Sequence, residues 1–511
     1  MAENRLRGAG LAILTVAVSL GIFMNVLDTS IANVSIPTLS GDLGVSPDEG
    51  TWVITSFAVS TAIALPLTGW LGKRFGEVRL FVASVLGFTL FSWLCGLSET
   101  LPTLVLFRVL QGAVAGPMIP LSQSLLLMNY PDEKKGLALA IWSLTAVVAP
   151  VAGPILGGWI TDDYSWPWIF YINVPVGLLA AFVTWRLLRH RETKIERLPV
   201  DVVGLGLLII GVASLQIMLD KGNDLDWFGS PTIITLAVVA FVSLSFFIVW
   251  ELTDRHPIVD LTLFRQLNFT VGTVAISLGY MVFFGNIVIF PLWLQTQMGY
   301  TPTWAGFAAA FIGILALVVS PVIGQMLAKF DLRLIVSFAF VVFALVSFWN
   351  ASFNTQVEFS QLVIPRLVFG LGVPCFFIPL IAMSLSGLPP NRVASASGLT
   401  NFLRILGGSF GVSLSVTLWD RRQSFYDNRL IEQFTAFNPV IHHHLDQLQG
   451  LGLDHLAAVA ALMRTTSQQA FMLATNDFFW LSGWLFLGLL VLVWFARAPF
   501  TVAGAGAMDA A

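Results

Sequence analysis

A single carboxylate stands inside an apolar stretch near the start of the chain. Asp28 lies in the segment 11–36, which as a helix rising about 1.5 Å per residue is long enough to cross a bilayer. A charge at that depth is costly unless it is paired, protonated or in contact with water. We therefore expect Asp28 to be a functional site. The alternative is a structural carboxylate that only holds helices together.

Three polar residues give the same segment a polar stripe. Asn25, Thr29 and Asn33 recur every four residues, so they lie on one face of a helix. Asp28 flanks that face. We expect the stripe to line a substrate cavity and Asp28 to face a protein interior or water rather than lipid.

The composition indicates that the rest of the chain also lies largely in a membrane. Of 511 residues, 56% are hydrophobic and 11% are charged, the mean hydropathy is +0.82, and long apolar runs recur from end to end. The sequence therefore predicts an all-α polytopic membrane protein. Cys95 and Cys375 both fall in predicted spans, which indicates neither a disulfide framework nor a metal-thiolate site. The histidine run 442–444 is only a weak metal signal, and we predict no metal site.

The apolar runs predict fourteen membrane spans, an even number that puts both termini on one side. The spans are expected at 11–36, 51–71, 79–98, 102–127, 137–161, 167–188, 202–219, 232–252, 270–296, 303–327, 333–352, 361–387, 395–418 and 475–496. Of the 26 lysines and arginines, eighteen fall on the side of the termini. That bias predicts that both ends are cytoplasmic.

An internal repeat divides these spans into two similar sets. Pro66-Leu-Thr-Gly69 recurs as Pro321-Val-Ile-Gly324, and Arg108-Val-Leu-Gln-Gly112 recurs as Arg366-Leu-Val-Phe-Gly370, at offsets of 255 and 258 residues. The predicted architecture is a six-helix bundle (1–190), two inserted helices (191–260) and a second six-helix bundle (261–511), which includes an external loop at 420–474. Two similar bundles around a midplane cavity are typical of rocker-type secondary transporters.

In this architecture a second charged residue, Arg108, lies at about the same depth in the membrane as Asp28. Arg108 lies about six residues into the fourth span, at a depth similar to that of Asp28, so we expect the two to pair. Entry of substrate or water would change the protonation balance of such a pair, which suggests proton coupling. The alternative is a permanent structural ion pair. The ninth span, which is the repeat counterpart of the first, carries Asn286 but no carboxylate.

Other polar residues within the spans are weaker candidates for a substrate cavity. Gln123, Asn286, Arg366 and Arg404 are expected to line it, where the arginines would meet anionic or polar substrates. A snorkelling or carbonyl-capping role explains the arginines equally well.

The fifth span is rich in glycine and proline, namely Pro150, Gly153, Pro154, Gly157 and Gly158. Small residues allow helices to approach closely and prolines bend them. We expect a moving interface there, with ordinary tight packing as the alternative.

The sequence lacks the residues that several classes of function would require. The chain has no phosphate-binding loop of the G-x-x-x-x-G-K-[ST] type, which argues against an ATP-driven pump. A membrane-embedded enzyme would need paired carboxylates or a metal cluster, whereas Asp28 is the single carboxylate in the interior of a predicted span. A proton-coupled uptake symporter would share the fold and stays open as an alternative.

Four successive motifs resemble those of a known family. LDTSIANVSIP around Asp28, the loop GWLGKRFGEVR, RVLQG around Arg108, and AGPILGG in the fifth span are similar to the signatures of drug:proton antiporters of the major facilitator superfamily. Fourteen spans narrow the resemblance to the EmrB/QacA group, and stretches such as WIFYINVPVG and GYTPTWAG strengthen it.

The resemblance implies roles for individual residues. Asp28 and Arg108 occupy the positions associated with proton coupling, and the five residues of the fifth span form the antiporter motif. The cytoplasmic loop motif corresponds to Gly69, Lys73, Arg74, Gly76, Glu77 and Arg79. The wider superfamily usually has an acid where this chain has Lys73, so the residue of the usual charge latch is missing here, and Glu77 is the candidate substitute.

The resemblance also implies a function and partners. It implies proton-driven export of hydrophobic toxic compounds across a bacterial inner membrane, with the proton gradient as the energy source and no cofactor. It further implies a periplasmic adaptor of the EmrA type and a TolC-like outer-membrane channel. A narrower specificity, such as the fatty-acid export of FarB-like proteins, remains an alternative. The stretch from His444 to Leu473 is expected to be largely helical and suits either docking or an intramolecular cap.

Overall fold

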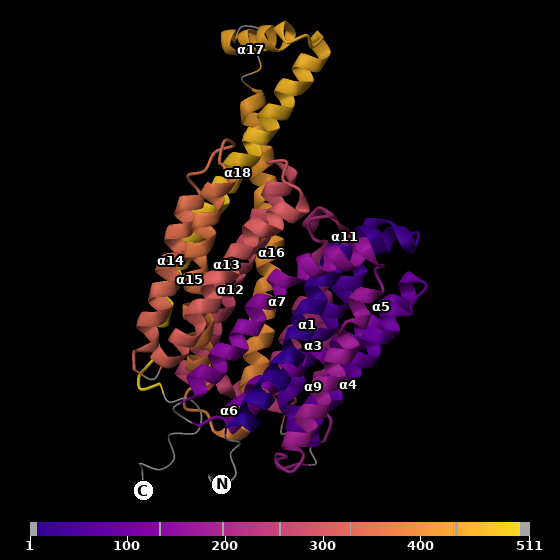
Figure 1. Ribbon diagram of the computed structural model, residues 1–511, viewed down its shortest axis with the longest axis vertical. Coiled ribbons are helices and arrows are strands. Elements are labelled where there is room, and N and C mark those ends of the chain that lie inside the picture. The colour runs from indigo at the N-terminus through magenta and orange to yellow at the C-terminus, as the bar shows by residue number, and fades with distance from the viewer. Residues whose placement is uncertain are drawn as a thin grey trace.

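The computed structural model describes residues 8–131, 134–196, 199–254, 257–327, 329–432, 434 and 438–500. Side chains at positions 34, 47, 48, 146, 147, 150, 151, 154, 155, 162, 302 and 303 lie outside this description, and so do the predicted roles of the Pro150 and Pro154 side chains. The secondary-structure elements in these ranges are helices (Figure 1). Helices satisfy every backbone group internally, as a lipid environment requires.

The first half of the chain forms the helices that hold the predicted ion pair. They are α1 (Ala9–Asp42), α2 (Pro47–Gly50), α3 (Trp52–Phe75), α4 (Glu77–Gly96), α5 (Leu101–Ala115), α6 (Met118–Asn129), α7 (Lys135–Asp163), α8 (Trp168–Tyr171) and α9 (Asn173–Leu188). We call α1 to α9 the first half. The fourth predicted span is divided into α5 and α6 at Gly116-Pro117, because proline lacks the N–H needed to continue a helix.

Two inserted helices, α10 (Val202–Lys221) and α11 (Pro231–Thr253), connect the first half to the second. The second half consists of α12 (Leu267–Thr296), α13 (Pro302–Met326), α14 (Leu332–Asn350), α15 (Phe359–Ser384), α16 (Val393–Ile431), α17 (Pro439–Gly450) and α18 (His455–Val493). Short 3-10 turns lie at Trp227–Gly229, Leu261–Arg265 and Pro390–Arg392.

The predicted spans and the observed helices agree closely. Among the described residues, thirteen helical segments are long and apolar enough to cross a membrane, with α5 and α6 counted together and α8 counted with α9. In addition α7, which is 29 residues long, packs along α1 and α13 at the place of the predicted fifth span. The all-α polytopic fold is therefore confirmed. The side of the membrane on which the termini lie stays a prediction, as do the bounds of the three predicted units.

The two halves lie side by side and touch along four helix pairs (Figure 1). α13 and α15 pack against α7, while α16 packs against α3 and α6. Small residues permit this approach: a Cβ at Gly69 would lie 2.7 Å from the Cα of Ser395, and one at Gly136 would collide with the carbonyl of Gly324. Gly69 and Gly136 lie near the end of the bundle that the charge bias predicts to be cytoplasmic. The halves are therefore in close contact at that end.

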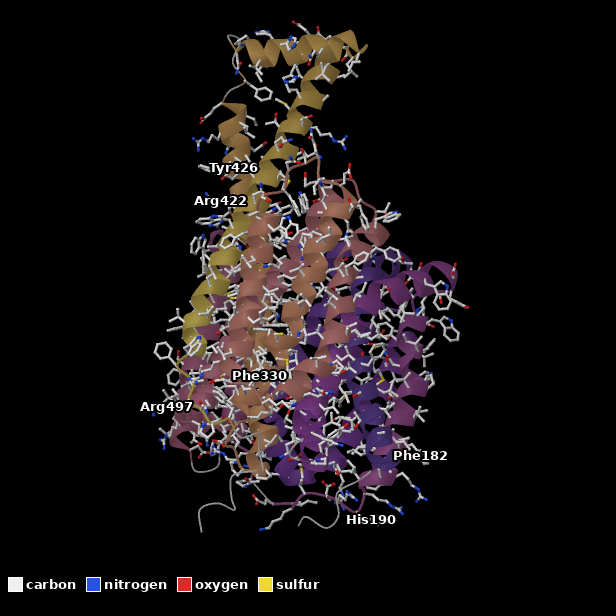
Figure 2. All side chains as sticks on the ribbon, turned by 60° about the vertical axis from the view of Figure 1, so that its left-hand side comes forward. Phe182, His190, Phe330, Arg422, Tyr426 and Arg497 are labelled. Atoms are coloured by element: carbon white, nitrogen blue, oxygen red, sulfur yellow. The ribbon has the colours of Figure 1, made fainter. Side chains whose placement is uncertain are left out.

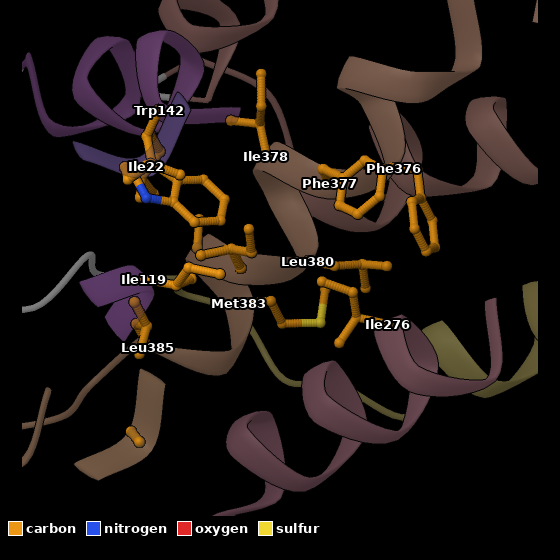
Figure 3. Close-up of a cluster of buried hydrophobic side chains, with 14 of the residues drawn as sticks. Ile22, Ile119, Trp142, Ile276, Phe376, Phe377, Ile378, Leu380, Met383 and Leu385 are labelled. Atoms are coloured by element: carbon orange, nitrogen blue, oxygen red, sulfur yellow. The ribbon is translucent and has the colours of Figure 1, made fainter. Parts of the chain in front are cut away.

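Apolar side chains occupy both the interior and the outer surface. One buried cluster includes Ile119 and Trp142 of the first half together with Ile378 of α15 and Leu385 directly after it, so it extends across the contact between the halves (Figure 3). Large apolar side chains such as Phe182, which is 67% exposed, cover the outside (Figure 2). A surface of this kind suits contact with lipid chains.

One region differs from the sequence prediction. The segment 420–474, predicted to be an external loop that is largely helical from His444, contains more helix than expected, because α16 continues to Ile431 and α18 begins at His455. The two helices extend beyond the bundle and α17 crosses their tips (Figure 1). The helix expected from His444 to Leu473 is interrupted between Gly450 and His455.

Candidate functional site

Asp28 and Arg108 form an ion pair inside the first half, as the sequence predicts. An Nη1 atom of Arg108 lies 2.5 Å from Oδ2 of Asp28, and the two residues are 0% and 2% exposed, respectively. α1 supplies the carboxylate and α5 supplies the guanidinium. Because both charges are removed from solvent, each depends on the other for compensation.

Arg108 is held from several directions. Its Nε donates to the carbonyl of Val53 at 2.9 Å, and its Nη1 also donates to Oε1 of Gln111 at 2.8 Å. The guanidinium carbon lies 4.2 Å from the ring centre of Phe57. Its Nη2 is buried without a hydrogen-bond partner in the described structure. The site thus fixes the cation but leaves one of its donors unused.

Two amide side chains complete the site, and the sequence analysis did not identify them. Asn173 on α9 donates to Oδ1 of Asp28 at 2.9 Å, and Gln111 donates to the same atom at 3.3 Å. Gln111 lies three residues after Arg108 and therefore on the same helical face, which is a usable sequence signal. Asn173 is an amide near the start of an otherwise apolar span, which is a weaker signal.

The polar stripe of α1 does not join this site as a unit. Asn25 is buried and donates to the carbonyl of Ala115 at 3.2 Å. Thr29 bonds the backbone of Asn25, and Asn33 is exposed. Asp28 therefore points to a different partner set, and a cavity role for these three residues stays a prediction.

The glycines of α7 allow it to pack closely on α1 beside the ion pair. A Cβ at Gly153 would collide with the side chain of Ser30, two residues after Asp28, and a Cβ at Gly157 would lie 3.3 Å from the Cα of Ile31. At Gly158 nothing lies within 4 Å. Because α7 also contacts α13 of the second half, a shift at Asp28 has a short path to the contact between the halves.

Gln123 and Arg404 belong to a polar group between the halves. Oε1 of Gln123, on α6, accepts from the hydroxyl of Ser397 and, at 3.2 Å, from Nδ2 of Asn401, both on α16. Asn401 in turn accepts from Nη2 of Arg404 at 3.0 Å. Arg404 is 8% exposed, its Nε has no hydrogen-bond partner, and its guanidinium carbon lies 4.8 Å from the ring centre of Tyr280.

Arg366, the repeat counterpart of Arg108, has a different environment. It is 1% exposed, its Nε and Nη2 are buried without partners, and its guanidinium carbon lies 3.4 Å from the ring centre of Phe290. Asn286 is fully buried and donates to the carbonyl of Val282, while its side-chain oxygen has no partner. Among the described residues, no carboxylate forms an ion pair with Arg366.

The residues of the predicted cytoplasmic loop motif form hydrogen bonds with α6 and with the segment that follows α9. Glu77 is buried and accepts from the hydroxyl of Ser124 on α6 at 2.6 Å, rather than from a residue of the second half. The backbone N–H of Arg79 donates to Glu192, and the carbonyl of Lys73 accepts from the backbone of Glu196. Gly76 has φ of +88°, where a side chain would also collide with Glu192. Arg74 lies over the ring of Trp70.

Asp28 is not the only carboxylate on the long apolar helices of the described structure. α10 ends at Lys221, two residues later than the sequence predicts, so Asp220 belongs to this helix and accepts a hydrogen bond from Thr55 of α3. Glu251 lies within α11 and accepts from the backbone of Val259. Both carboxylates lie near the ends of their helices. Glu251 already falls within the predicted span 232–252, whereas Asp220 falls just beyond the predicted span 202–219, because span boundaries are predicted least accurately.

The geometry described here suits a charge that can be switched. A proton on Asp28 of α1 would remove the negative charge that compensates Arg108. The change would affect α5, which supplies Arg108 and Gln111, and α9, which supplies Asn173.

The comparisons with known proteins agree with this fold and its order of motifs. The family model of the Major Facilitator Superfamily matches residues 18–412. The chain is 52% identical over 505 residues to the multidrug export protein EmrB of Escherichia coli, with 99% of each chain covered. It is 48% identical over 501 residues to the fatty acid resistance protein FarB of Neisseria gonorrhoeae, covering 98% of this chain and 99% of FarB.

A solved structure supports the fold independently. The proton:xylose symporter XylE superimposes with a TM-score of 0.59 at 14% sequence identity, covering 95% of each chain. At that identity the likeness concerns the fold alone. The sequence matches and the arrangement of helices together show that this chain belongs to the major facilitator superfamily.

Proposed function

We propose that this protein is a proton-driven exporter of hydrophobic toxic compounds. It acts by alternating access between its two halves, uses the proton gradient and needs no cofactor. The proposal is supported by the name of the E. coli relative, a multidrug export protein that matches along the full length of the chain.

One observation carries the proton coupling: a fully buried ion pair between Asp28 and Arg108 within the membrane-spanning part of the first half. Buried ionisable groups in membrane proteins commonly mark proton pathways. Arg108 also keeps one unused donor, Nη2, which gives the pair room to rearrange. A permanent structural pair would need no such reserve.

The proposed coupling follows from these contacts. Protonation of Asp28 removes the charge that holds Arg108, Gln111 and Asn173 around it, and this weakens the link between α1, α5 and α9. α1 then shifts against the glycine face of α7, which contacts the second half through α13. Loss of the proton restores the pair and the original packing. Substrate bound between the halves is carried across the membrane as the protein alternates between these two arrangements.

The export route proposed here continues beyond the membrane. We place the protein in a bacterial inner membrane with a periplasmic adaptor of the EmrA type and a TolC-like channel. The helical projection formed by the outer part of α16, by α17 and by the start of α18 is a suitable docking element, because α17 crosses its tip well away from the bundle (Figure 1). An intramolecular cap would instead lie over the bundle.

A narrower substrate range is the second candidate. The 48% identity to a fatty acid resistance protein favours export of fatty acids as part or all of the activity.

Inside-out vesicles that hold a pH gradient test the coupling. Hydrophobic drugs, fatty acids and a sugar are added in turn while lumenal pH is followed. We expect a hydrophobic drug to release protons through the native chain and not through Asp28→Asn, since an amide cannot carry the proton. The sugar should have no effect.

Asp42→Asn is the matched control, because Asp42 ends the same helix and is exposed. It should exchange like the native chain. If Asp28→Asn also exchanges like the native chain, Asp28 is structural and the proposed coupling is wrong.

A further inference from the structure

Arg404 lies at the middle of the membrane, where the halves meet. It is eleven residues after the start of α16 at Val393, or about 16 Å along a helix that crosses a hydrocarbon layer roughly 30 Å thick. It lies three residues after Asn401 and so on the same face, and Asn401 contacts Gln123 of the first half. Arg404 is therefore next to the polar contact between the halves.

No acid balances this charge. α12, α13, α14 and α15 contain neither aspartate nor glutamate, and the first acid of α16 is Asp420, about 24 Å further along the helix. The acids on helices packed against α16 lie at its outer part. Asp220 follows Leu219, which contacts Ser413, and Asp477 lies near Thr475, which contacts Trp419. In the described structure the cation at Arg404 has Asn401, a hydrogen bond with the Tyr280 side chain and ring faces for partners, and no carboxylate.

The surroundings of Arg404 combine this charge with an aromatic surface. Tyr280 and Phe377 lie 4.8 and 5.9 Å from its guanidinium carbon, measured to the ring centres. Phe284 stacks on Tyr280 at 5.1 Å and is half-buried. A cation bordered by aromatic rings suits a molecule with one acidic end and an apolar tail.

Arg366 does not offer a comparable site. It is enclosed by the rings of Phe290, Phe369 and Phe479 and is 1% exposed. It instead adds a second uncompensated positive charge to the same half, which strengthens the attraction for an anion at Arg404.

We propose that Arg404 binds the acidic group of an amphipathic organic anion, with Asn401 as its resting partner and the rings of Tyr280, Phe284 and Phe377 against the apolar tail. This assigns a substrate class to the proposed exporter and rests on that proposed function. The carboxylate supplies the counter-charge that the second half lacks. Its binding competes for the Nη2 donor that Asn401 holds in the free protein.

Binding to the purified full-length chain tests the site without relying on proton coupling. Three radiolabelled probes share one tail and differ in the head: laurate, lauryl alcohol and lauryl trimethylammonium. Arg404→Gln should weaken laurate binding by on the order of tenfold or more, because it removes a charge-assisted hydrogen bond. Binding of the alcohol should be unchanged. Arg404→Lys should retain part of the laurate affinity.

Arg421→Gln is the matched control, because it removes the same charge from an exposed position on the same helix. It should bind all three probes like the native chain. If Arg404→Gln does not fold, the lysine variant and the pH dependence of native binding decide. The affinity for laurate should fall as the pH drops below the pKa of the fatty acid, while that for the alcohol stays constant.

Two results would overturn the proposal. Equal weakening of laurate and alcohol by Arg404→Gln would make Arg404 a structural residue, and unchanged laurate binding would place the anion elsewhere. Neither result bears on the proposed proton-driven export. That proposal is wrong only if the native chain exchanges protons for no hydrophobic compound in the vesicle experiment.

Discussion

Arg108 and Arg366 occupy the same position in the two halves but have opposite partners. Arg108 bonds a carboxylate, an amide and a backbone carbonyl, whereas Arg366 lies against three phenylalanine rings with two nitrogen atoms unpaired. Both are essentially unexposed. The difference therefore comes from neighbouring residues and not from depth.

The neighbours differ at matching positions. The offset of 258 residues that relates Arg108 to Arg366 also relates Asp28 to Asn286 and Gln111 to Phe369. The first half thus has an acid and an amide where the second half has an amide and an aromatic ring. The repeat retains the helix scaffold while the ionisable site exists in one copy only. We infer that proton coupling and anion attraction are divided between the halves.

The largest expected difference in stability is that between removing Arg108 and removing Arg366. Arg108→Leu leaves the carboxylate of Asp28 buried without its cation and should lower the free energy of unfolding by about 3–5 kcal/mol. Arg366→Leu removes a buried charge without a counter-ion and should be neutral or stabilising. The lost ring contact is worth about 2 kcal/mol or more in a desolvated site, which is less than the several kcal/mol that burying the charge costs. Thermal unfolding of the purified variants in detergent measures both.

The double variant Asp28→Leu with Arg108→Leu is the control for this difference. It should recover most of the stability lost in Arg108→Leu, because no uncompensated charge remains. If Arg366→Leu lowers the free energy of unfolding as much as Arg108→Leu does, the two sites are energetically alike and the expected difference between them is wrong.

How far the sequence predicts this site depends on the range of each signal. Apolar runs of span length placed the membrane helices closely, since each run is a local property. The pairing of Asp28 with Arg108 was predictable because charges in lipid need partners and both lie at a similar depth. The role of Asn173 was not, because the approach of α9 to α1 depends on how the whole first half packs.

Two other features escaped prediction for physical reasons of their own. The part of α16 that extends beyond the bundle is polar enough to look like a loop, yet α-helical hydrogen bonds continue through it to Ile431. Asp220 was placed outside the membrane because hydropathy falls at Asp220-Lys221, while the helix continues to Lys221 and contacts Thr55 of α3.

An intermediate effect should follow from giving the second half its missing acid. Asn286 lies one helical turn before Phe290, the ring that Arg366 covers, and its buried oxygen is unpaired. Asn286→Asp places a carboxylate at the position equivalent to Asp28 and should stabilise the protein by about 1–3 kcal/mol through Arg366. Thermal unfolding again gives the measurement.

The sign of this effect should depend on Arg366. In an Arg366→Leu background the same Asn286→Asp change should destabilise the protein, because the new carboxylate would be buried alone. Asn286→Leu controls for loss of the amide. If Asn286→Asp destabilises the protein in both backgrounds, the two residues do not meet and the repeat does not extend to the geometry of the ion pair.

The smallest effect concerns the starts of α4 and α14, which are equivalent helices in the two halves. Glu192, from the chain after α9, accepts from the backbone N–H groups of Val78 and Arg79 at α4, whereas α14 is capped locally by Asp331. The side chain of Arg333 also donates to Asp331, with a distance of 2.6 Å for its shortest bond. These hydrogen bonds hold the pKa of the Asp331 carboxyl below its ordinary value.

A lowered pKa in the folded state fixes the direction of the pH dependence. The stabilisation by Asp331 is fully present above the pKa of the unfolded chain and is lost as the pH falls through the pKa of the folded state. Asp331→Asn keeps a good N-cap but loses the charge, so near neutral pH it should cost less than about 1 kcal/mol. The difference in thermal unfolding between native and variant should shrink on acidification. A constant difference would show that Asp331 acts at α14 as a neutral cap, without the charge that Arg333 contacts.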